Sequence, residues 1–290
     1  TNQLKLLGNN PMYAMIDTLL KTSTQNDPRQ VAIPDEAFIK RANLDKVWEI
    51  YTDRFKNAGD FTFFFVGSFK VDDVLPMIEK YIGNLPNTNR DETFKDVFNK
   101  FPSTTKNIEV RKGTEDKSMV GMIFSNDYEW SQDNNLYMNM FEQALSIKLI
   151  EVIREKMSGV YSPQTQLQVE KYPTSNYTLM VLFGCSPKNA DKLTKAVMKI
   201  IADFQKNGID EATLNKVKEQ TLRKRETDIK TNKFWLNKIS DTYFYGDQMN
   251  VNDFEARVKA VTSKDIQNVV TKFVKKDHYV RAVLYPEKKK

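Results

Sequence analysis

Two consecutive β-type segments with different hydrophobic patterns constrain the fold of this chain most. From Ser162 to Glu170 hydrophobic residues alternate with glutamines, whereas Tyr177 to Cys185 is apolar at nearly every position. The first pattern predicts a strand with one exposed face, and the second predicts a buried strand. Turn-forming residues at 173–176 separate them. We therefore expect a hairpin of two antiparallel strands.

The residues around this hairpin extend it into a complete domain. Two further strands are predicted on either side of a polar turn at 113–116, and another strand near the end of the chain. Apolar residues at helical spacing predict the remaining elements. The predicted strands are 107–111, 119–125 and 279–284, and the predicted helices are 133–156, 189–206, 210–228 and 263–275. These elements predict an α+β fold, with helices packed on one face of an antiparallel sheet.

The first 86 residues have a different organisation. Helices are predicted at 11–22, 34–40, 43–55 and 71–82, and the continuous apolar run 61–66 predicts a strand. Residues 87–105 are polar and rich in turn formers, which is typical of a linker. We therefore divide the chain into a segment 1–86, a linker 87–105 and a domain 106–290.

One helix–strand unit occurs twice in the chain. Trp48 to Val66 and Ile266 to Leu284 share a helix, a basic residue followed by Phe, a short break and an apolar strand. The first copy has far fewer residues in front of it than the second. We therefore expect one complete domain preceded by the tail of a similar one. The chain begins at Thr1 rather than Met, and we expect it to be the C-terminal part of a longer polypeptide.

Composition excludes several functional classes. The chain has one Cys and one His, so it can form neither an internal disulfide nor an ordinary Cys/His zinc site. The net charge of +6 is spread along the sequence, which favours a solvated surface over a nucleic-acid interface. We expect His278 at the surface or at the start of a strand, Cys185 in the core, and the aromatic residues of 234–245 in packing between helices.

The best chemical lead lies where the long helix ends and the half-exposed strand begins. Arg154 and Tyr161 lie on either side of a turn at Ser158-Gly159. A guanidinium and a phenol placed in this way can converge on one peptide carbonyl or oxyanion. The alternative is structural: Arg154 and Lys156 complement the helix dipole, and Tyr161 only starts a strand. The residues alone leave both interpretations open.

Three stretches of the chain resemble the C-terminal half of the insulinase (pitrilysin) family of zinc metallopeptidases. They are 61–86 (FTFFFVGSFKVDDVLPMIEKYIGNLP), 153–162 (IREKMSGVYS) and the helix within 209–226. The resemblance implies a clamshell of four similar domains of the LuxS/processing-peptidase type. Residues 1–86 would be the C-terminal part of the third domain and 106–290 the fourth.

The resemblance also implies roles and partners. Arg154 and Tyr161 would hold the substrate backbone and support the transition state at a zinc ion in the other half. The family's H-x-x-E-H zinc motif is absent, so zinc would belong to the parent enzyme and this chain would bind none and be inactive alone. Ser158 stands where the family commonly has Gly, and this difference affects the orientation in which the turn presents Tyr161. The implied partners are an N-terminal zinc-bearing half and an extended peptide, without nucleic acid or membrane insertion. The implied location is the bacterial periplasm or another extracytoplasmic compartment.

Two other functions stay open from the sequence. The chain could be a catalytically inactive relative that acts as a structural or peptide-binding subunit, because a fold does not determine a function. It could also be an unrelated binding domain whose positive charge attracts anionic surfaces or nucleic acid. The expected function is the non-zinc half of a metalloendopeptidase that hydrolyses extended peptides.

Overall fold

The computed structural model describes residues 7–29, 34–88, 92–97, 99–158 and 160–288. The chain forms two compact units. The first consists of residues 1–36, 96–222 and 254–290, and the second of residues 37–95 and 223–253. The units cross the predicted division at 86 and 106, because residues before 36 pack with the later domain. That division stays a prediction.

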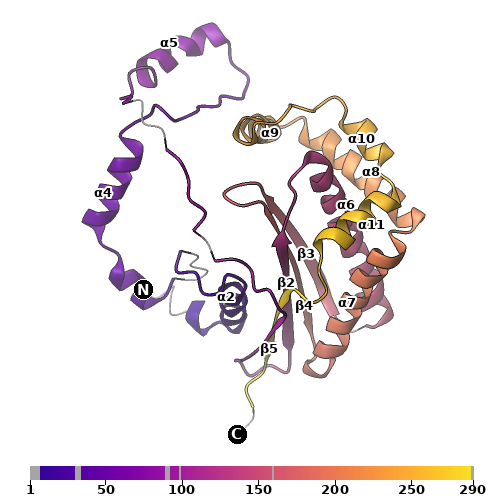
Figure 1. The fold of residues 1–290 in the computed structure, drawn as a ribbon. Coiled ribbons are helices and arrows are strands. Elements are labelled where there is room, and N and C mark those ends of the chain that lie inside the picture. Colours follow the sequence, from indigo (N-terminus) through magenta and orange to yellow (C-terminus); the bar gives the residue numbers. More distant parts are fainter. Residues whose placement is uncertain (1–6, 30–33, 89–91, 98, 159, 289–290) are drawn as a thin grey trace. The chain divides into compact units, whose positions relative to one another are not determined.

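A five-stranded sheet is the centre of the first unit (Figure 1). Its strands are β1 (Lys106–Arg111), β2 (Ser118–Asp127), β3 (Val160–Glu170), β4 (Asn176–Cys185) and β5 (Tyr279–Tyr285). Their order across the sheet is β1-β5-β2-β4-β3. The predicted hairpin is present, with β3 and β4 antiparallel from Val160 opposite Cys185 to Glu170 opposite Asn176.

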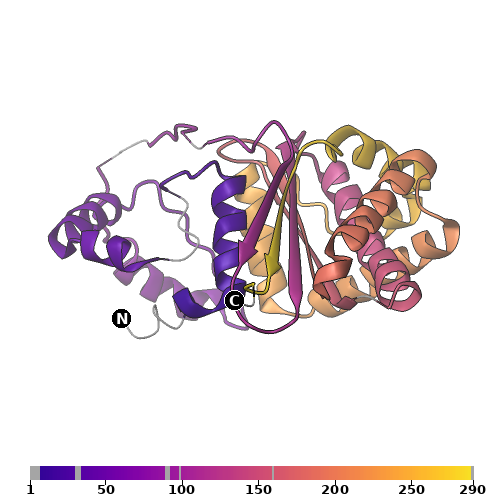
Figure 2. The ribbon, with the colours of Figure 1, turned by 90° about the horizontal axis from the view of Figure 1, so that it is seen from below.

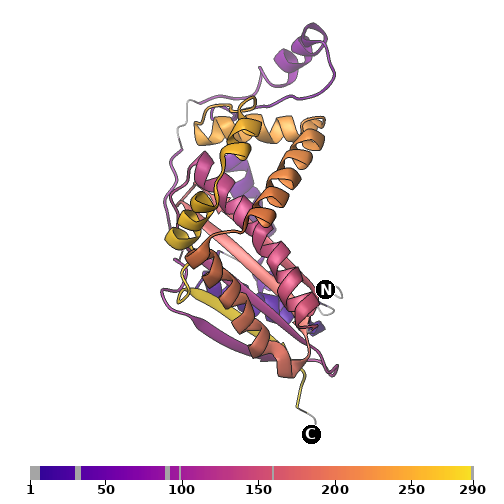
Figure 3. The ribbon, with the colours of Figure 1, turned by 90° about the vertical axis from the view of Figure 1, so that its right-hand side faces the viewer.

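One face of the sheet is covered by a layer of helices (Figure 3). The layer contains α6 (Gln132–Leu149), the π-helix η1 (Ile150–Lys156), α7 (Ala190–Asn207), α8 (Glu211–Asp228), α10 (Phe254–Ala260) and α11 (Ser263–Phe273). A short 3-10 helix, η2 (Pro187–Asn189), precedes α7. The layer belongs to the first unit, except for the last residues of α8.

Capping residues define the ends of these helices. The Ser131 hydroxyl caps α6, and Thr262 and Asp265 form a reciprocal capping box at α11. Gly208 ends α7 with φ of +72°. A side chain at this position would collide with Ser263, since an added Cβ would lie 2.4 Å from its hydroxyl oxygen.

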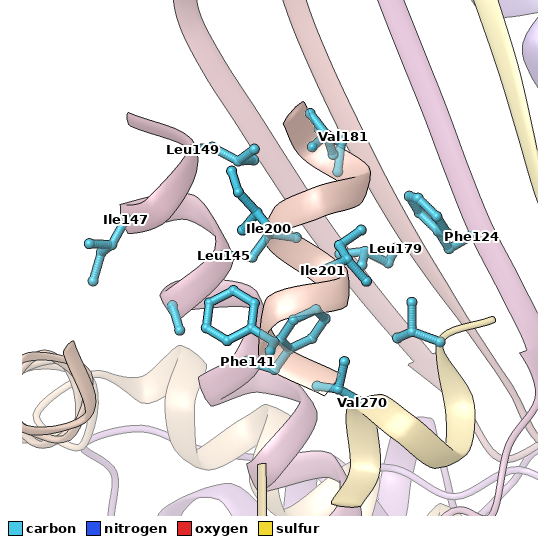
Figure 4. Packing of buried hydrophobic residues seen from close by; sticks show 14 of the residues in the cluster. Phe124, Phe141, Leu145, Ile147, Leu149, Leu179, Val181, Ile200, Ile201 and Val270 are labelled. Atoms are coloured by element: carbon cyan, nitrogen blue, oxygen red, sulfur yellow. The ribbon is translucent and has the colours of Figure 1, made fainter. Parts of the chain in front are cut away.

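The main core lies between the sheet and this helical layer. In Figure 4, Phe141 and Leu145 of α6 and Ile201 of α7 point toward the strands. The ring of Phe141 meets Phe204 edge-on, with ring centroids 5.5 Å apart. Buried hydrophobic residues of β2 and β4 complete the core from the other side. Burial of this apolar surface is the main source of stability for the unit.

The predicted α+β fold is confirmed, and one helix from the preceding segment adds to it on the other face of the sheet. Helix α2 (Pro11–Ser23) packs on the opposite face of the sheet (Figure 2). Its buried Met15 and Leu19 form a second core with Ile123, Val280 and Ala282. The periodicity of α2 predicts an apolar helix face but does not indicate which surface that face covers. The predicted helical layer on one face is present, and α2, which lies outside the predicted domain 106–290, adds a helix to the other face.

One strand pair departs from the predicted antiparallel sheet. Strand β1 pairs with β5 in parallel, from Lys106 opposite Val280 to Arg111 opposite Tyr285. Strands β1 and β2 are consecutive in the chain but do not pair, because β5 lies between them. A pairing between such distant segments leaves no signal in the local hydrophobic pattern.

The second unit contains α4 (Leu44–Phe55), α5 (Val71–Tyr81) and α9 (Asn232–Tyr245). Helix α3 (Glu36–Arg41) precedes them, and the boundary between the units falls at its start. The predicted strand 61–66 is not a strand in the structure. Phe61, Phe63 and Phe65 on one side of this segment are exposed. A strand needs a neighbour to share its backbone hydrogen bonds, and segment 61–66 belongs to no sheet.

Candidate functional site at the start of β3

The site begins where helix α6 changes its geometry. Sequence periodicity predicts one helix over 133–156, but the α-helix ends at Leu149 and continues as the π-helix η1. The Met157 N–H donates to the Val152 carbonyl at 3.0 Å, a bond that spans five residues. Short π-helices are rare and occur frequently at functional sites. Arg154 lies on η1, and its side chain is exposed.

A charged cluster holds the junction between α6 and η1. The Lys148 ammonium lies 3.0 Å from Glu151 and 2.9 Å from Asp210. Burial opposes ionisation of Asp210, but hydrogen bonds from Thr213 and Lys148 outweigh it and lower the pKa of Asp210 to about 2. Asp210 also accepts from the Thr213 N–H at 2.9 Å, which caps α8. The cluster therefore ties the start of η1 to the start of α8.

The turn after η1 takes an unusual backbone conformation at Ser158. Its φ is +46°, in the left-handed region that favours glycine. The Ser158 hydroxyl lies 3.5 Å from the Glu155 carbonyl, at the outer limit of a hydrogen bond. The resemblance to the insulinase family implies a Gly at position 158, and the backbone at this position has positive φ. Gly159, which the sequence analysis also assigned to this turn, lies outside the described residues.

Strand β3 then carries Tyr161 into the sheet, where its backbone pairs with Gly184. The structure therefore places Arg154 and Tyr161 on the two elements joined by this turn, as the sequence predicted. The side chain of Tyr161 lies outside the described part of the structure. Whether the two side chains converge on one substrate group stays a prediction.

A β-bulge follows Tyr161. The register of β3 against β4 shifts between Tyr161 and Gln164, so β3 has one extra residue there. After the bulge, Thr165, Leu167 and Val169 turn toward the helices, and Thr165 donates a hydrogen bond to Glu142 of α6. The alternate residues Gln164, Gln166 and Gln168 are exposed, which matches the half-exposed strand that the sequence predicts.

The position of β3 in the sheet gives these residues a free side. Because β3 is the outermost strand of the described sheet, only one of its sides pairs with a neighbour. A groove of about 410 Å³ lies along this edge. Its lining residues, which define the Glu142 groove, are Glu142, Ser146, Pro163, Gln164, Thr165, Gln166, Met180 and Leu182.

Sequence reasoning missed the edge position of β3 and the contribution of Glu142. One signal was available, because Pro163 interrupts an alternating pattern, and proline in a sheet is confined to edge strands, strand starts and bulges. Glu142 gave no signal, since its role depends on how α6 lies against β3. The same holds for Lys148 and Asp210, which belong to different helices.

The described residues offer no site for zinc. Within the described ranges, no three His, Cys, Asp or Glu side chains come close enough together to hold a metal ion. His278 lies in the turn before β5, where its N–H donates to the Lys275 carbonyl at 3.4 Å. Cys185 is buried in the core, and burial raises the pKa of its thiol to about 11. No step of zinc chemistry can therefore be assigned to these residues.

The aromatic stretch 234–245 lies on α9, where Tyr243 and Phe244 are exposed. The predicted packing between helices therefore does not describe these two residues.

Of the helices that the structure describes, none combines the length and the hydropathy that a bilayer span requires.

Comparison with known proteins identifies the family. Residues 41–221 match the family described as Peptidase M16 inactive domain. The chain is 26% identical over 171 residues to the probable zinc protease PqqL of Haemophilus influenzae, covering 58% of this chain and 18% of the relative. Identity to the probable zinc protease PqqL of Escherichia coli is 22% over 225 residues, covering 76% and 24%. The chain thus spans less than a quarter of the length of these relatives.

Solved structures show the same fold. The periplasmic protease PqqL from Escherichia coli matches 99% of this chain with a TM-score of 0.83 and 20% identity, over 32% of its own chain. A peptidase M16 inactive domain from Pseudomonas fluorescens matches 99% with a TM-score of 0.76 and 16% identity, over 69% of its own chain. The chain belongs to the M16 peptidase family, as an example of its inactive domain. The predicted membership of the insulinase family is confirmed.

Proposed function

We propose that this chain is the non-zinc half of an M16 metalloendopeptidase and holds an extended peptide while a zinc-bearing half cleaves it. One observation carries the proposal: exposed Arg154 lies on a π-helix that leads, through the turn at Ser158, directly into the free edge strand β3. If Arg154 only complemented the dipole of a helix end, neither a π-helix nor a following edge strand that can pair with a peptide would be required. Membership of the inactive-domain family supports the proposal independently.

Arg154 would bind the substrate backbone. A guanidinium donates several hydrogen bonds in a fixed plane, so it can hold a peptide carbonyl and also stabilise the negative charge that develops on that oxygen during hydrolysis. Tyr161 would donate from its hydroxyl to the same region. Neither residue activates water, so they would support a reaction whose zinc ion and general base lie on the other half.

The required partner is the half that carries the H-x-x-E-H motif, either on the same polypeptide or on another chain. The Escherichia coli relative of known structure is described as a periplasmic protease. This description supports an extracytoplasmic location for the present protein as well. We propose the periplasm, or an equivalent compartment, as the place of action.

The test is chelator-sensitive cleavage of an unstructured peptide by the assembled enzyme. Arg154→Ala should lower kcat/KM by a factor of about ten to a thousand, the range for losing a donor to a developing oxyanion. Lys156→Ala is the matched control, because it removes an exposed cation from the same π-helix and should leave kcat/KM nearly unchanged.

The outcomes separate the candidate functions. Equal effects of Arg154→Ala and Lys156→Ala would contradict the assignment of Arg154 and favour the purely structural interpretation of both cations. An assembled protein that binds the peptide without cleaving it would point to the inactive peptide-binding subunit instead.

A further inference from the structure

The helix–strand unit that occurs twice in the sequence is buried at its second occurrence and exposed at its first. In the second repeat, four apolar positions of α11 and β5 are at most 5% exposed: Ile266, Val269, Phe273 and Val283. At the aligned positions of the first repeat, in α4 and segment 61–66, the side chains are 47–64% exposed: Trp48, Tyr51, Phe55 and Phe65. The same apolar pattern therefore lies in a core in one repeat and at a surface in the other.

The second repeat shows which partners bury such a unit. Strand β5 lies between two strands, parallel to β1 and antiparallel to β2. Helix α11 packs on α6 and α7. All four partners lie within residues 106–207. A partner that buries the first repeat in the same way must therefore supply two strands beside 61–66 and two helices over α4.

Within the second unit, segment 61–66 is covered on one side only. The ring of Phe64 meets Tyr243 of α9 edge-on, with ring centroids 5.6 Å apart, and Phe64 is half-buried. The alternate residues Phe61, Phe63 and Phe65 are exposed. Alternation of this kind is typical of a strand, yet 61–66 is not part of the described sheet. The segment therefore has the side-chain pattern of a strand without neighbouring strands.

Another molecule of this chain does not fit as the partner. It would have to supply the elements of its own residues 106–207, and these already hold the β5 and α11 of that molecule. The curated relatives suggest a different source, because this chain spans less than a quarter of their length. A protein of that length has room for a further segment with the arrangement of residues 106–207.

We propose that α4 and segment 61–66 are the docking surface for such a segment of the parent protein, with two strands and two helices arranged as in residues 106–207. On docking, 61–66 becomes the middle strand of a mixed sheet, and Trp48, Tyr51 and Phe55 enter a core. Docking is favoured because it buries apolar surface and pairs the main-chain groups of 61–66. The completed domain includes α9, so it does not end at residue 86. The inference is independent of the proposed function, since it involves no step of hydrolysis.

The test compares hydrogen exchange in the natural full-length protein with that in the 290-residue chain, at a concentration where the shorter chain is monomeric. Amides of residues 62–66 should exchange at least about 100-fold more slowly in the full-length protein, because hydrogen bonds to both neighbouring strands protect them. Amides of β5, which is already paired on both sides, should be protected equally in the two proteins and are the internal control. Equally fast exchange of 62–66 in both proteins would overturn the proposal.

Two neighbouring residues of α4 provide a matched pair of variants. Ile50 and Tyr51 are both 52% exposed, but Tyr51 aligns with buried Val269, whereas Ile50 aligns with exposed Asn268. In the full-length protein, Tyr51→Asp should remove the protection of 62–66 and lower the Tm, and Ile50→Asp should change neither. In the 290-residue chain the two variants should behave alike. Equal effects of both variants in the full-length protein would contradict the proposed core.

Exchange over a concentration series of the 290-residue chain tests the other possible partner. If 62–66 became protected as the concentration rose, another molecule of the chain would be the partner and the proposal would be wrong. The proposed function fails separately. If Arg154→Ala left cleavage unchanged while 62–66 stayed protected in the full-length protein, the docking surface would stand and the role of Arg154 would not.

Discussion

Ser158 illustrates a conflict between residue type and backbone conformation. A serine side chain disfavours the left-handed region by about 1 kcal/mol, and the contact of its hydroxyl with Glu155 is too long to offset much of that cost. Such strained residues occur often at functional sites. Here the strained residue separates the helix that carries Arg154 from the strand that carries Tyr161.

Replacing Ser158 should therefore change stability in a defined order. We expect Ser158→Gly to stabilise the protein by about 0.5 kcal/mol, since relief of strain exceeds the extra entropy of glycine in the unfolded chain. Ser158→Val should destabilise it by about 1 kcal/mol or more, because a branched side chain tolerates positive φ poorly. Urea denaturation of the three proteins measures this order. A glycine variant less stable than the serine protein would contradict it.

The ionisation of Asp210 should make the stability of the protein depend on pH. The pKa of Asp210 is about 2 in the folded protein and 3.8 in the reference state. Because the folded pKa is lowered, its stabilising contribution is present above pH 3.8 and is lost as the pH falls toward 2. Asp210 is half exposed, so screening limits the contribution to under about 1 kcal/mol.

Asp210→Asn isolates the contribution of the Asp210 charge to stability, because asparagine also caps helices well but has no charge. The stability difference between the two proteins should shrink when denaturation is measured at pH 2.5 instead of pH 6. A difference that is independent of pH would show that Lys148 gains nothing from the charge of Asp210.

Helix α2 packs closely on strand β2 because one residue of the strand has no side chain. Gly121 of β2 lies under α2, where an added Cβ would come within 2.7 Å of the Leu19 side chain. Because Leu19 is buried, it cannot move aside freely. Glycine at position 121 therefore allows α2 to pack closely on the sheet.

Gly121→Val should therefore destabilise the protein by about 1–3 kcal/mol through overpacking. The matched control is Gly184→Ala on β4, where the nearest atom, in Met119, lies at an ordinary 3.7 Å. Thermal denaturation should show a clear loss of stability for the first variant and a much smaller change for the second. Hydrogen exchange would locate the loss in α2. Similar effects of both variants would contradict the packing argument.

The elements that the sequence predicted well are those with a local pattern. The β3–β4 hairpin, α7 and α11 follow from alternation, helical stripes and capping residues. The π-helix could not be predicted, since Ile150–Lys156 has the same apolar spacing as the α-helix before it. The parallel β1–β5 pair and the place of α2 were inaccessible because they depend on contacts between distant segments. For the same reason the sequence motif led to the prediction of Arg154 as a site residue, which stays a prediction, whereas no motif pointed to Glu142.

At the scale of the molecule, the second unit exposes a continuous row of aromatic rings. Trp48, Tyr51, Phe55, Phe61 and Phe63 form this aromatic row, with successive ring centroids 5.7, 4.7, 5.8 and 6.2 Å apart. Each of these residues is more than a third exposed. Contiguous exposed apolar surface is typical of an interaction site or of a surface prone to aggregation.

We expect the chain on its own to self-associate at micromolar concentrations through this row. The double variant Trp48→Lys, Phe55→Lys should reduce association while changing the free energy of unfolding by less than about 0.5 kcal/mol, because both residues are exposed. Val71→Lys, at an exposed position outside the row, is the control. Sedimentation velocity over a concentration series measures the effect. A chain that stays monomeric at 100 μM would contradict the expectation.

The position of β5 between β1 and β2 has a consequence for synthesis. A ribosome makes β1, β2 and the hairpin long before it makes β5, so the growing chain carries a gap in the middle of its sheet until the last strand emerges. During that interval both neighbours of the gap present unpaired edges. The protein is therefore most vulnerable to misfolding just before β5 emerges, and a molecular chaperone that shields strand edges would help it most at that moment.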